Sequence, residues 1–381
     1  MTTPPYSLKQ LVLYFLWLGT IGFGGPVALV GYMHRDLVDN RKWIGEEDYR
    51  EGLALAQLAP GPLAAQLSIY LGYVHYKILG ATLAGLAFVM PSFIMVLGLG
   101  YAYVKAGGLP WMQAVFYGIG AAVIGIIAVS SYKLSRKSLG KDWLLWAIAI
   151  VLAISTFITE REILWMILLA GIIVWIYRFP PKFNDIHNTI NFSPVLLQVV
   201  GNFPINEKLG QIGWFFFKAG AFVFGSGLAI VPFLYGGVVK EYQWLDEQQF
   251  LDAVAVAMIT PGPVVITVGF IGYLVAGVPG ACVASLATFL PCYLFTIIPA
   301  PYFKKYGKNP SIKAFVDGVT AAAIGAIIGA VIVLGNRQLS DVVSLLLALF
   351  TVIVLLKFKR IQEPVIIIVA AILGLLIKGF W

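Results

Sequence analysis

Charged residues are scarce in this chain: of its 381 residues, 12% are charged and 60% are hydrophobic. An ordinary soluble domain has roughly a quarter of its residues charged, so this composition excludes one. Long uncharged runs of helix-spanning length predict instead an all-α, polytopic membrane protein whose partner is the lipid bilayer. The first ten residues lack a basic region, and no small-residue cleavage site follows the first apolar run, so we expect no cleavable signal peptide.

Cysteine and histidine are also rare, with two and three residues. Cys282 and Cys292 both fall in an apolar span, which favours inert packing residues over a disulfide or a metal pair. The histidines lie in loops without the spacing of metal ligands, and the sequence has no Walker-type glycine loop or other ATP-binding motif. We therefore expect neither an enzyme nor a metal or cofactor; transport would be driven by a gradient or by anion exchange.

An internal repeat organises the rest of the sequence. At one constant offset, Phe23-Gly24-Gly25-Pro26 aligns with Phe224-Gly225-Ser226-Gly227, Trp43 with Trp244, and Pro60-Gly61-Pro62 with Pro261-Gly262-Pro263. After a one-residue slip the match continues from Gly72-Tyr73 on Gly272-Tyr273 to Ala121-Ala122 on Ala321-Ala322. The repeat predicts half one at residues 1–178, a linker at 179–209, and half two at 210–381.

Each half is predicted to contain the same segments. A first helix with a glycine-rich break (about 9–33 and 211–236) precedes a polar loop and a Pro-Gly-Pro segment (about 50–75 and 251–275). Four apolar spans follow, at about 79–104, 111–132, 143–159 and 163–178 in half one and at about 280–300, 311–334, 341–357 and 364–379 in half two. The chain would thus have about 10 transmembrane helices besides the two Pro-Gly-Pro segments.

The two Pro-Gly-Pro sequences interrupt runs that otherwise predict membrane helices. Prolines lack an N–H group and clash with the preceding turn, so neither run continues as one α-helix. In hydrocarbon such a break is tolerated where the freed backbone is buried in protein or lines a wet cavity. Two breaks at corresponding positions of a repeat are typical of a transporter's binding site. The alternative is a pair of proline-kinked packing helices.

Loop charge predicts the topology, and it explains the net charge of +8 better than nucleic-acid binding does. If each Pro-Gly-Pro segment is a re-entrant hairpin and the other five segments of each half cross, the loops near 34–50, 77, 133–141, 178–208, 304–313 and 357–360 face the cytoplasm. They hold most of the Lys and Arg residues, whereas the outer side receives Lys9, Lys105, Arg161, Lys240, Arg337 and Lys378. Five crossings is an odd number, so half two is predicted to be inverted relative to half one.

Each break is predicted to expose backbone N–H groups to a bound anion. If Pro62 begins the outgoing half-helix, the N–H groups of Leu63, Ala64 and Ala65 point into the break, as do those of Val264, Val265 and Ile266 in half two. Helix N-termini bind anions through such donors and the positive end of the helix dipole. The further candidate binding residues are Gly24, Gly25, Gln57, Pro60, Gly61, Gln66, Gly225, Ser226, Gly227, Thr260, Pro261, Gly262 and Pro263. For each polar one, the alternative is helix capping or interhelical bonding.

Lys218 is a basic residue predicted to lie within the membrane. A lysine at the middle of a membrane helix costs about 2.5–3.5 kcal/mol on insertion scales, so such a residue is a functional candidate. The alternative is that its side chain extends to the cytoplasmic interface. Its repeat partner is Trp17, so this charge belongs to one half only.

Three acids are candidates for coupling transport to protons. Asp317, whose repeat partner is Tyr117, lies within a predicted span; the alternative is a residue near the helix start that interacts with the helix dipole. Glu51 and Asp252 occupy equivalent positions at the mouths of the two hairpins and are the secondary candidates.

Two groups of motifs carry a family resemblance. The first comprises Leu18-Gly19 through Phe23-Gly24-Gly25-Pro26, the basic loop ending Arg41-Lys42-Trp43, and Gln57-Leu58-Ala59-Pro60-Gly61-Pro62; the second comprises Phe224-Gly225-Ser226-Gly227, Trp244 and Thr260-Pro261-Gly262-Pro263. Together they resemble the chromate ion transporter (CHR, ChrA-type) family in its long two-domain form, over nearly the whole chain. The resemblance implies a prokaryotic cytoplasmic-membrane protein that exports chromate, with sulfate as competitor or exchange partner. The family's first helix often has a basic residue where this chain has Trp17, and Lys218 keeps that residue in half two.

The leading hypothesis is a secondary transporter that exports chromate. It binds the dianion near the midplane between the two breaks and alternates access by rocking one half against the other. One alternative keeps the fold and carries sulfate or another anion, because sulfate nearly matches chromate in size and charge. Another is a passive channel or a membrane scaffold. The sequence leaves open the coupling ion, the direction of flux and assembly as a homodimer.

Overall fold

The computed structural model describes residues 5–22, 25–106, 110–159, 164–180, 207–223, 230–303, 309–339, 341–358, 361 and 363–378. These ranges contain helices and turns but no strand, which confirms the predicted all-α fold. Four helical stretches in them are long and apolar enough to cross a membrane: Leu63–Lys105, Ala114–Arg136, Val264–Ile297 and Pro310–Asn336. Shorter apolar helices accompany them, so the chain is a multi-pass membrane protein.

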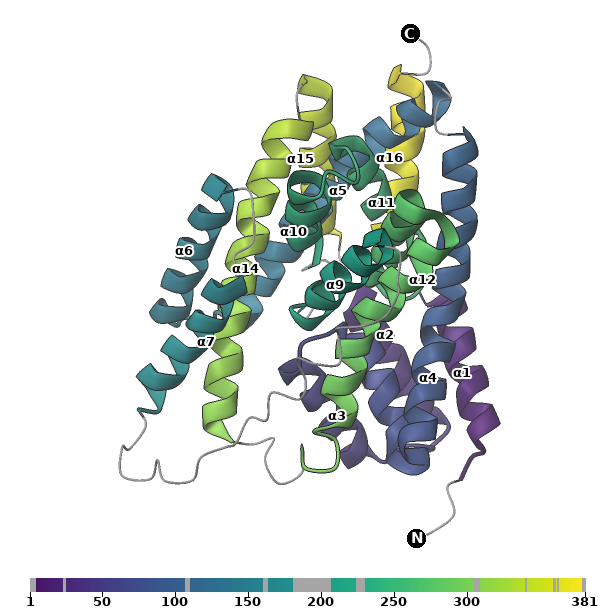
Figure 1. Cartoon of the computed structure of the whole chain (residues 1–381), viewed down its shortest axis with the longest axis vertical. Coiled ribbons are helices and arrows are strands. Elements are labelled where there is room, and N and C mark those ends of the chain that lie inside the picture. The colour runs from purple at the N-terminus through teal and green to yellow at the C-terminus, as the bar shows by residue number, and fades with distance from the viewer. Residues whose placement is uncertain are drawn as a thin grey trace.

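The α-helices and π-helices follow in the same order along residues 1–178 and 207–378, and the second stretch has one additional 3₁₀ turn. Figure 1 shows where most of the α-helices lie. Half one has α1 (Leu8–Ile21), α2 (Gly25–Met33), the π-helix η1 (His34–Asn40), α3 (Glu46–Leu58), α4 (Leu63–Ala106), α5 (Pro110–Ser138), α6 (Trp143–Thr159) and α7 (Leu164–Arg178). Half two has α9 (Glu207–Ala221), α10 (Ile230–Leu234), the π-helix η4 (Tyr235–Glu241), α11 (Glu247–Ile259), the 3₁₀ turn η5 (Val264–Ile266), α12 (Thr267–Ile297), α14 (Pro310–Gln338), α15 (Val342–Lys357) and α16 (Glu363–Lys378).

The predicted helix breaks are present. α1 ends before Gly22 and α2 starts at Gly25, while α3 ends before Ala59 and α4 starts after Pro62. The first predicted helix of half one folds back on itself at its break, because Tyr6 stacks on Trp43 at 4.9 Å and the Tyr14 hydroxyl donates to the Tyr32 carbonyl oxygen at 3.5 Å. The prediction that this segment crosses the membrane, with Lys9 outside and the loop at 34–50 inside, is therefore wrong. The corresponding segment of each half ends later than predicted, in a π-helix that reaches Asn40 and Glu241. No sequence pattern predicts these π-turns, since a π-helix differs from an α-helix by a single residue in its hydrogen-bond spacing.

A sharp turn follows each Pro-Gly-Pro segment near its predicted end. In α4 it lies at Lys77 (φ 53°), and in α12 at Ala276 and Gly277 (φ 62°). The stretch from Leu63 to the first turn is therefore shorter than the roughly 20 residues that a spanning helix needs, and α3 has 13 residues. Neither α3 nor this first part of α4 is long enough to cross a bilayer by itself.

The last two helices of each half pack against the other half. α6 and α7 lie against α14, and α15 and α16 lie against α5 (Figure 1). Glycines allow the close approach: a Cβ atom on Gly325 would overlap the carbonyl oxygen of Ala149, and one on Gly118 would overlap that of Ala370. Small residues at helix contacts are the usual means of tight packing in membranes. A second set of contacts joins α1 to α4, α4 to α12, and α12 to α9.

Two ion pairs hold α6 and α7 of half one against α14 of half two; we call helices that pack on the other half exchanged helices. Arg178, at the end of α7, donates hydrogen bonds to Asp142, just before α6, and to Asp317 of α14, each at 2.6 Å. Asp317 is thus paired with an arginine of the other half, a role that neither interpretation of the sequence included. The pairing connects the start of α6, the end of α7 and α14 at one point.

A corresponding set of contacts holds α15 and α16 of half two against α5 of half one. The Tyr117 hydroxyl of α5 donates to the two carboxylate oxygens of Asp341, just before α15, at 2.6 and 2.8 Å. Lys378, at the end of α16, places its Nζ 4.7 Å from the Tyr117 ring centroid. Tyr117 is the repeat partner of Asp317, so the two sets are equivalent in position but differ in charge.

Replacing Arg178 by glutamine is expected to lower the free energy of unfolding by about 1 kcal/mol, because both ion pairs are partly exposed and such pairs contribute up to about 1 kcal/mol each. The reason is that Asp142 and Asp317 would then face each other without an intervening cation. Thermal unfolding of the detergent-solubilised protein, followed by tryptophan fluorescence, measures the change. Lys378→Gln is the matched control, because Lys378 lies over a ring and not between two carboxylates. Equal losses in both variants would show that the ion pairs add no stability of their own.

Candidate functional site

The helix breaks of the two halves contact each other. The Gly61 N–H donates to the carbonyl oxygen of Val223, just after α9, at 2.5 Å. The Gly262 N–H donates to the carbonyl oxygen of Gly22, just after α1, at 3.0 Å. Each Pro-Gly-Pro break is therefore hydrogen-bonded to the glycine-rich break of the other half. The two bonds join residues that the repeat offset makes equivalent, and they satisfy backbone groups that a helix would otherwise pair.

The central glycine of each Pro-Gly-Pro sequence cannot be another residue without strain. Gly61 has φ 144° and Gly262 has φ 89°, a region that side chains disfavour. A Cβ atom on Gly61 would lie 2.7 Å from Cδ of Gln66, and one on Gly262 would overlap the hydroxyl of Ser92. Both the backbone conformation and the surroundings therefore require glycine here.

The outgoing half-helix in half one has the free donors that the sequence predicts. α4 begins at Leu63, one residue later than expected, with Pro62 before it. Its first intrahelical bond runs from the Gln66 N–H to the Pro62 carbonyl oxygen at 2.9 Å. The N–H groups of Leu63, Ala64 and Ala65 thus have no acceptor within the helix, and all three residues are buried.

Half two differs from the prediction at one residue. Val264–Ile266 form a 3₁₀ turn, in which the Ile266 N–H donates to the Pro263 carbonyl oxygen at 3.0 Å. The prediction that Ile266 offers a free N–H is wrong, because the tighter turn pairs it three residues back. Val264 and Val265 precede the first bond of this turn and keep N–H groups without an acceptor inside it.

The polar side chains beside the breaks are engaged differently. Gln66 is fully buried; its Nε2 donates to the Pro60 carbonyl oxygen at 2.9 Å, and its Oε1 has no partner among the described residues. The Thr260 hydroxyl donates to the Ala257 carbonyl oxygen at 3.1 Å, so its proton is already used within α11. Gln57, in the last turn of α3, is exposed.

Two residues beside the breaks were not predicted. The buried Ser92 hydroxyl of α4 donates to the Pro261 carbonyl oxygen at 2.6 Å, across the two halves. Its repeat equivalent is Cys292 of α12, whose Sγ would lie 3.1 Å from a Cβ atom on Gly61. The signal available in the sequence was their position one residue after the aligned prolines Pro91 and Pro291. Cys292 is fully buried, as expected for a packing residue.

Lys218 lies in the last turn of α9, close in sequence to the break at Val223. Its side chain is half-buried, and its Nζ is 5.7 Å from the ring centroid of Trp214, one turn earlier in the helix. The ammonium therefore lies toward the start of α9, the direction of the cytoplasmic interface in the predicted topology. This geometry is compatible with both interpretations of Lys218.

Asp252 is the deepest of the three candidate acids. It is 3% exposed, in the fully buried face of α11, and it accepts hydrogen bonds from the Tyr103 hydroxyl and from Gln248 Nε2, both at 2.8 Å. Tyr103 comes from α4 of the other half, so this carboxylate also connects the halves. Among the described residues no lysine or arginine forms an ion pair with it. Glu51, its equivalent in half one, is half-buried beside Tyr70.

Four of the predicted site residues lie outside the described residues: Gly24, Gly225, Ser226 and Gly227. Gly25 is the first residue of α2. The glycine-rich breaks are therefore placed by Gly22 and Val223, which flank those residues. Their contribution to anion binding stays a prediction.

Comparison with known proteins gives one consistent answer. A family profile described as "Chromate transporter" matches residues 9–175 and again residues 210–375. The chain is 68% identical to the "Chromate transport protein" of Cupriavidus metallidurans over 98% of this chain and 94% of that protein. It is 62% identical to the "Probable chromate transport protein" of Synechococcus elongatus (99% and 97%) and 30% identical to the "Chromate transport protein" of Pseudomonas aeruginosa (98% and 93%). No solved structure matches it. The chain belongs to the chromate transporter family.

Proposed function

We propose that this protein is a secondary active transporter that exports chromate across the cytoplasmic membrane of a bacterium or archaeon. The substrate is proposed from the names of the relatives that the chain matches along its length. The observation that carries the site is the pair of cross-half hydrogen bonds, from Gly61 to Val223 and from Gly262 to Gly22. They hold two helix N-termini with unpaired donors beside the breaks of the opposite half.

In this proposal the dianion lies between the Pro-Gly-Pro breaks and accepts hydrogen bonds from free backbone N–H groups. Leu63, Ala64 and Ala65 supply them from one side, and Val264 and Val265 from the other. Such donors are fixed by the fold, so little reorganisation is needed to bind an oxyanion. In this proposal the Gln66 amide leaves the Pro60 carbonyl oxygen and donates to the anion. Lys218, in the last turn of α9, adds a positive charge when its side chain turns from Trp214 toward the break.

The exchanged helices change which parts would move. The sequence suggests rocking of half one against half two, but α6 and α7 are fastened to α14 and α15 and α16 to α5. In our proposal the halves, at residues 1–178 and 210–381 with the linker at 179–209, form an inverted repeat. Two bundles move in this proposal: one consists of α6, α7 and α14, and the other of α5, α15 and α16. They move around the inner helices α1, α4, α9 and α12. The two Pro-Gly-Pro segments are re-entrant hairpins within that inner group.

Asp252 is the proposed proton-coupling residue, in preference to Asp317 and Glu51. Asp317 is already engaged in an ion pair with Arg178. Asp252 is buried with neutral donors only, so its charged form lacks a compensating cation. It also contacts α4 of the other half through Tyr103, so a change in its charge would be felt where the two halves meet within the inner group.

Uptake of radiolabelled chromate into inverted membrane vesicles tests the proposed function, because export appears there as uptake. We expect saturable uptake above the level of empty membranes, inhibited by sulfate and reduced when the proton gradient is collapsed. Accumulation against the gradient would exclude a passive channel or scaffold. Absence of chromate uptake would contradict the proposal, and labelled sulfate in the same vesicles would then test the alternative substrate.

Replacing Lys218 by alanine is expected to reduce chromate uptake by roughly tenfold or more, the effect of losing one charge-assisted interaction of about 1.5–3 kcal/mol. The measurement is initial uptake rate in inverted vesicles at equal protein content. Lys208→Ala, at the exposed start of the same helix, is the matched control. Near-normal uptake by the Lys218 variant would favour the interpretation that this side chain only extends to the interface.

A further inference from the structure

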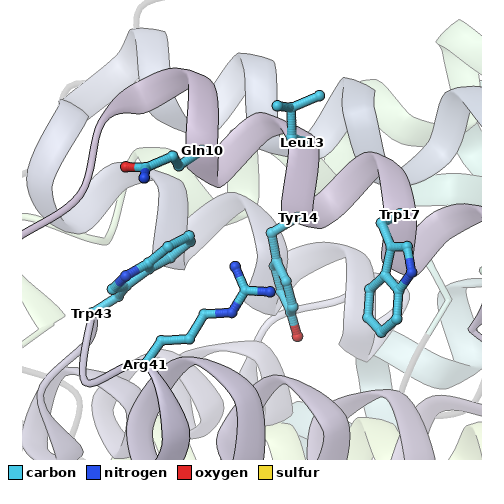
Figure 2. A pocket seen from close by; sticks show the side chains of 6 residues that line it. All are labelled: Gln10, Leu13, Tyr14, Trp17, Arg41 and Trp43. Carbon is cyan, nitrogen blue, oxygen red and sulfur yellow. The ribbon is translucent and has the colours of Figure 1, made fainter.

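A groove of about 300 Å³ lies away from the helix breaks, where the chain that follows η1 passes the exposed face of α1 (Figure 2). It is lined by Gln10, Leu13, Tyr14 and Trp17 of α1 and by Arg41 and Trp43. Figure 2 shows the Arg41 side chain reaching between the rings of Tyr14 and Trp43. Nothing in the proposed transport mechanism uses these residues.

Arg41 is held by aromatic rings and not by a carboxylate. Its guanidinium carbon lies 5.1 Å from the Tyr14 ring centroid and 4.7 Å from that of Trp43. Among the described residues it forms no ion pair. Stacking uses the faces of the guanidinium and leaves its N–H edges available. Those edges form a planar fork that suits a phosphate or carboxylate group.

Half two has aromatic rings at the equivalent positions. Tyr242 stands where half one has Arg41; it stacks on Trp244 with centroids 4.5 Å apart and packs on Phe215 at 5.6 Å. Trp214 stands in place of Leu13, and Lys218 in place of Trp17. The groove of half one therefore differs from the equivalent place in half two at two positions: Arg41 replaces a tyrosine, and Leu13 replaces the larger Trp214.

The exposed apolar side chains that line the groove decide what kind of anion fits. Leu13 is 52% exposed and Trp17 is 47% exposed, on the outward face of a membrane helix. A free oxyanion has no apolar part to cover them, whereas a phospholipid does. Amphipathic rings such as those of Trp17 and Trp43 are typical of the headgroup level of a membrane, and basic pockets at that level bind anionic headgroups.

We propose that this groove binds one anionic phospholipid. Arg41 holds its phosphate between Tyr14 and Trp43, and an acyl chain covers Leu13 and Trp17. The lipid groove and the proposed chromate site share no residue. The lipid proposal can therefore be wrong while the transport proposal is right, and the reverse.

Native mass spectrometry of the purified full-length protein tests the proposal. The protein is titrated with phosphatidylglycerol, with phosphatidylcholine of the same acyl chains, and with inorganic phosphate. The wild type is expected to bind one phosphatidylglycerol roughly tenfold tighter than phosphatidylcholine. Both lipids offer a phosphate to Arg41, but the choline cation of phosphatidylcholine repels the guanidinium, whereas phosphatidylglycerol has a net negative charge. Arg41→Gln should lose that preference. Leu13→Trp keeps the charge but puts a larger ring in the groove, the residue that half two has at the equivalent position, and should lose the bound lipid.

Arg136→Gln is the matched control, because Arg136 also lies over one ring, that of Tyr132 at 5.9 Å, but outside the groove. It should bind lipid as the wild type does. Equal affinity for the two lipids, or an unchanged preference in Arg41→Gln, would overturn the proposal. So would inorganic phosphate that competes as well as the lipid does, because the groove would then bind a free oxyanion. A dimer that Leu13→Trp dissociates would also overturn it, because the groove would then belong to a second copy of the chain.

Discussion

Replacing Gly61 by alanine is expected to reduce chromate uptake by roughly 100-fold or more. At φ 144° an L side chain is strained by about 1–3 kcal/mol, and the new methyl group would collide with the buried Gln66 amide. Relief of that collision would shift the Gly61 N–H away from Val223 and rotate the three free donors that follow Pro62. Each 1.4 kcal/mol is about a factor of ten. Initial uptake rates in inverted vesicles, at equal amounts of folded protein, measure the effect, and Gly262→Ala should behave alike.

Gly98→Ala is the control for a general effect of the substitution. Gly98 lies within α4, has no positive φ, and offers open space, with no neighbouring atom within 4 Å of an added methyl group. Alanine there should be neutral or should stabilise the helix by about 0.5–1 kcal/mol.

If Gly61→Ala fails to fold, Ser92→Ala tests the same site with a smaller change. It removes only the hydroxyl bonded to the Pro261 carbonyl oxygen, and we expect a roughly fivefold to tenfold loss of uptake from one missing bond. Near-normal uptake by both break variants would contradict a site at the breaks.

The breaks themselves could be predicted from the sequence because their causes are local. Proline removes a donor and glycine permits a positive φ, whatever surrounds them. The same logic placed the start of the outgoing helix to within one residue, at Leu63. It failed at Ile266, because the choice between a 3₁₀ turn and an α-turn at a helix start depends on small energy differences that composition does not reveal.

The contacts between halves could not be predicted in the same way. Gly61 and Val223, or Ser92 and Pro261, lie more than 150 positions apart, and only packing brings them together. The sequence shows that Asp317 is an acid within a span, but its pairing with Arg178 follows from the exchange of α7 onto the other half. The repeat would have allowed one step more: positions equivalent to Tyr117, Asp341 and Lys378 carry the ion pairs around Arg178, so the two sets could have been sought together.

Replacing Asp252 by asparagine is expected to make chromate uptake insensitive to the proton gradient. The carboxylate is 3% exposed and is held by two neutral donors, Tyr103 and Gln248. In the proposed mechanism this carboxylate takes up a proton on one side of the membrane and releases it on the other, and no cation competes with that proton, because its two partners are neutral. Asparagine keeps the shape and a hydrogen-bonding group but cannot ionise. The measurement is the ratio of uptake with and without an uncoupler.

For the wild type we expect that ratio to be at least about fivefold, the lower range of coupling between two sites, and for Asp252→Asn we expect a ratio near one. Glu51→Gln is the matched control, because it changes the equivalent acid in half one, which is only half-buried. A ratio near one in both variants would assign coupling to the pair of acids and not to Asp252 alone.

Tyr103→Phe separates ionisation from packing at the same place. It removes one donor from Asp252 and leaves the carboxylate able to gain and lose a proton. Uptake by this variant should be slower but should still respond to the gradient, whereas a purely structural role of Asp252 would make both variants slow and equally responsive. The position of Tyr103 on α4 and of Asp252 on α11 gives the reason for expecting coupling here. The charge that changes lies at the contact between the two halves, eight residues along the chain from Thr260, where the Pro-Gly-Pro break that the anion would occupy begins.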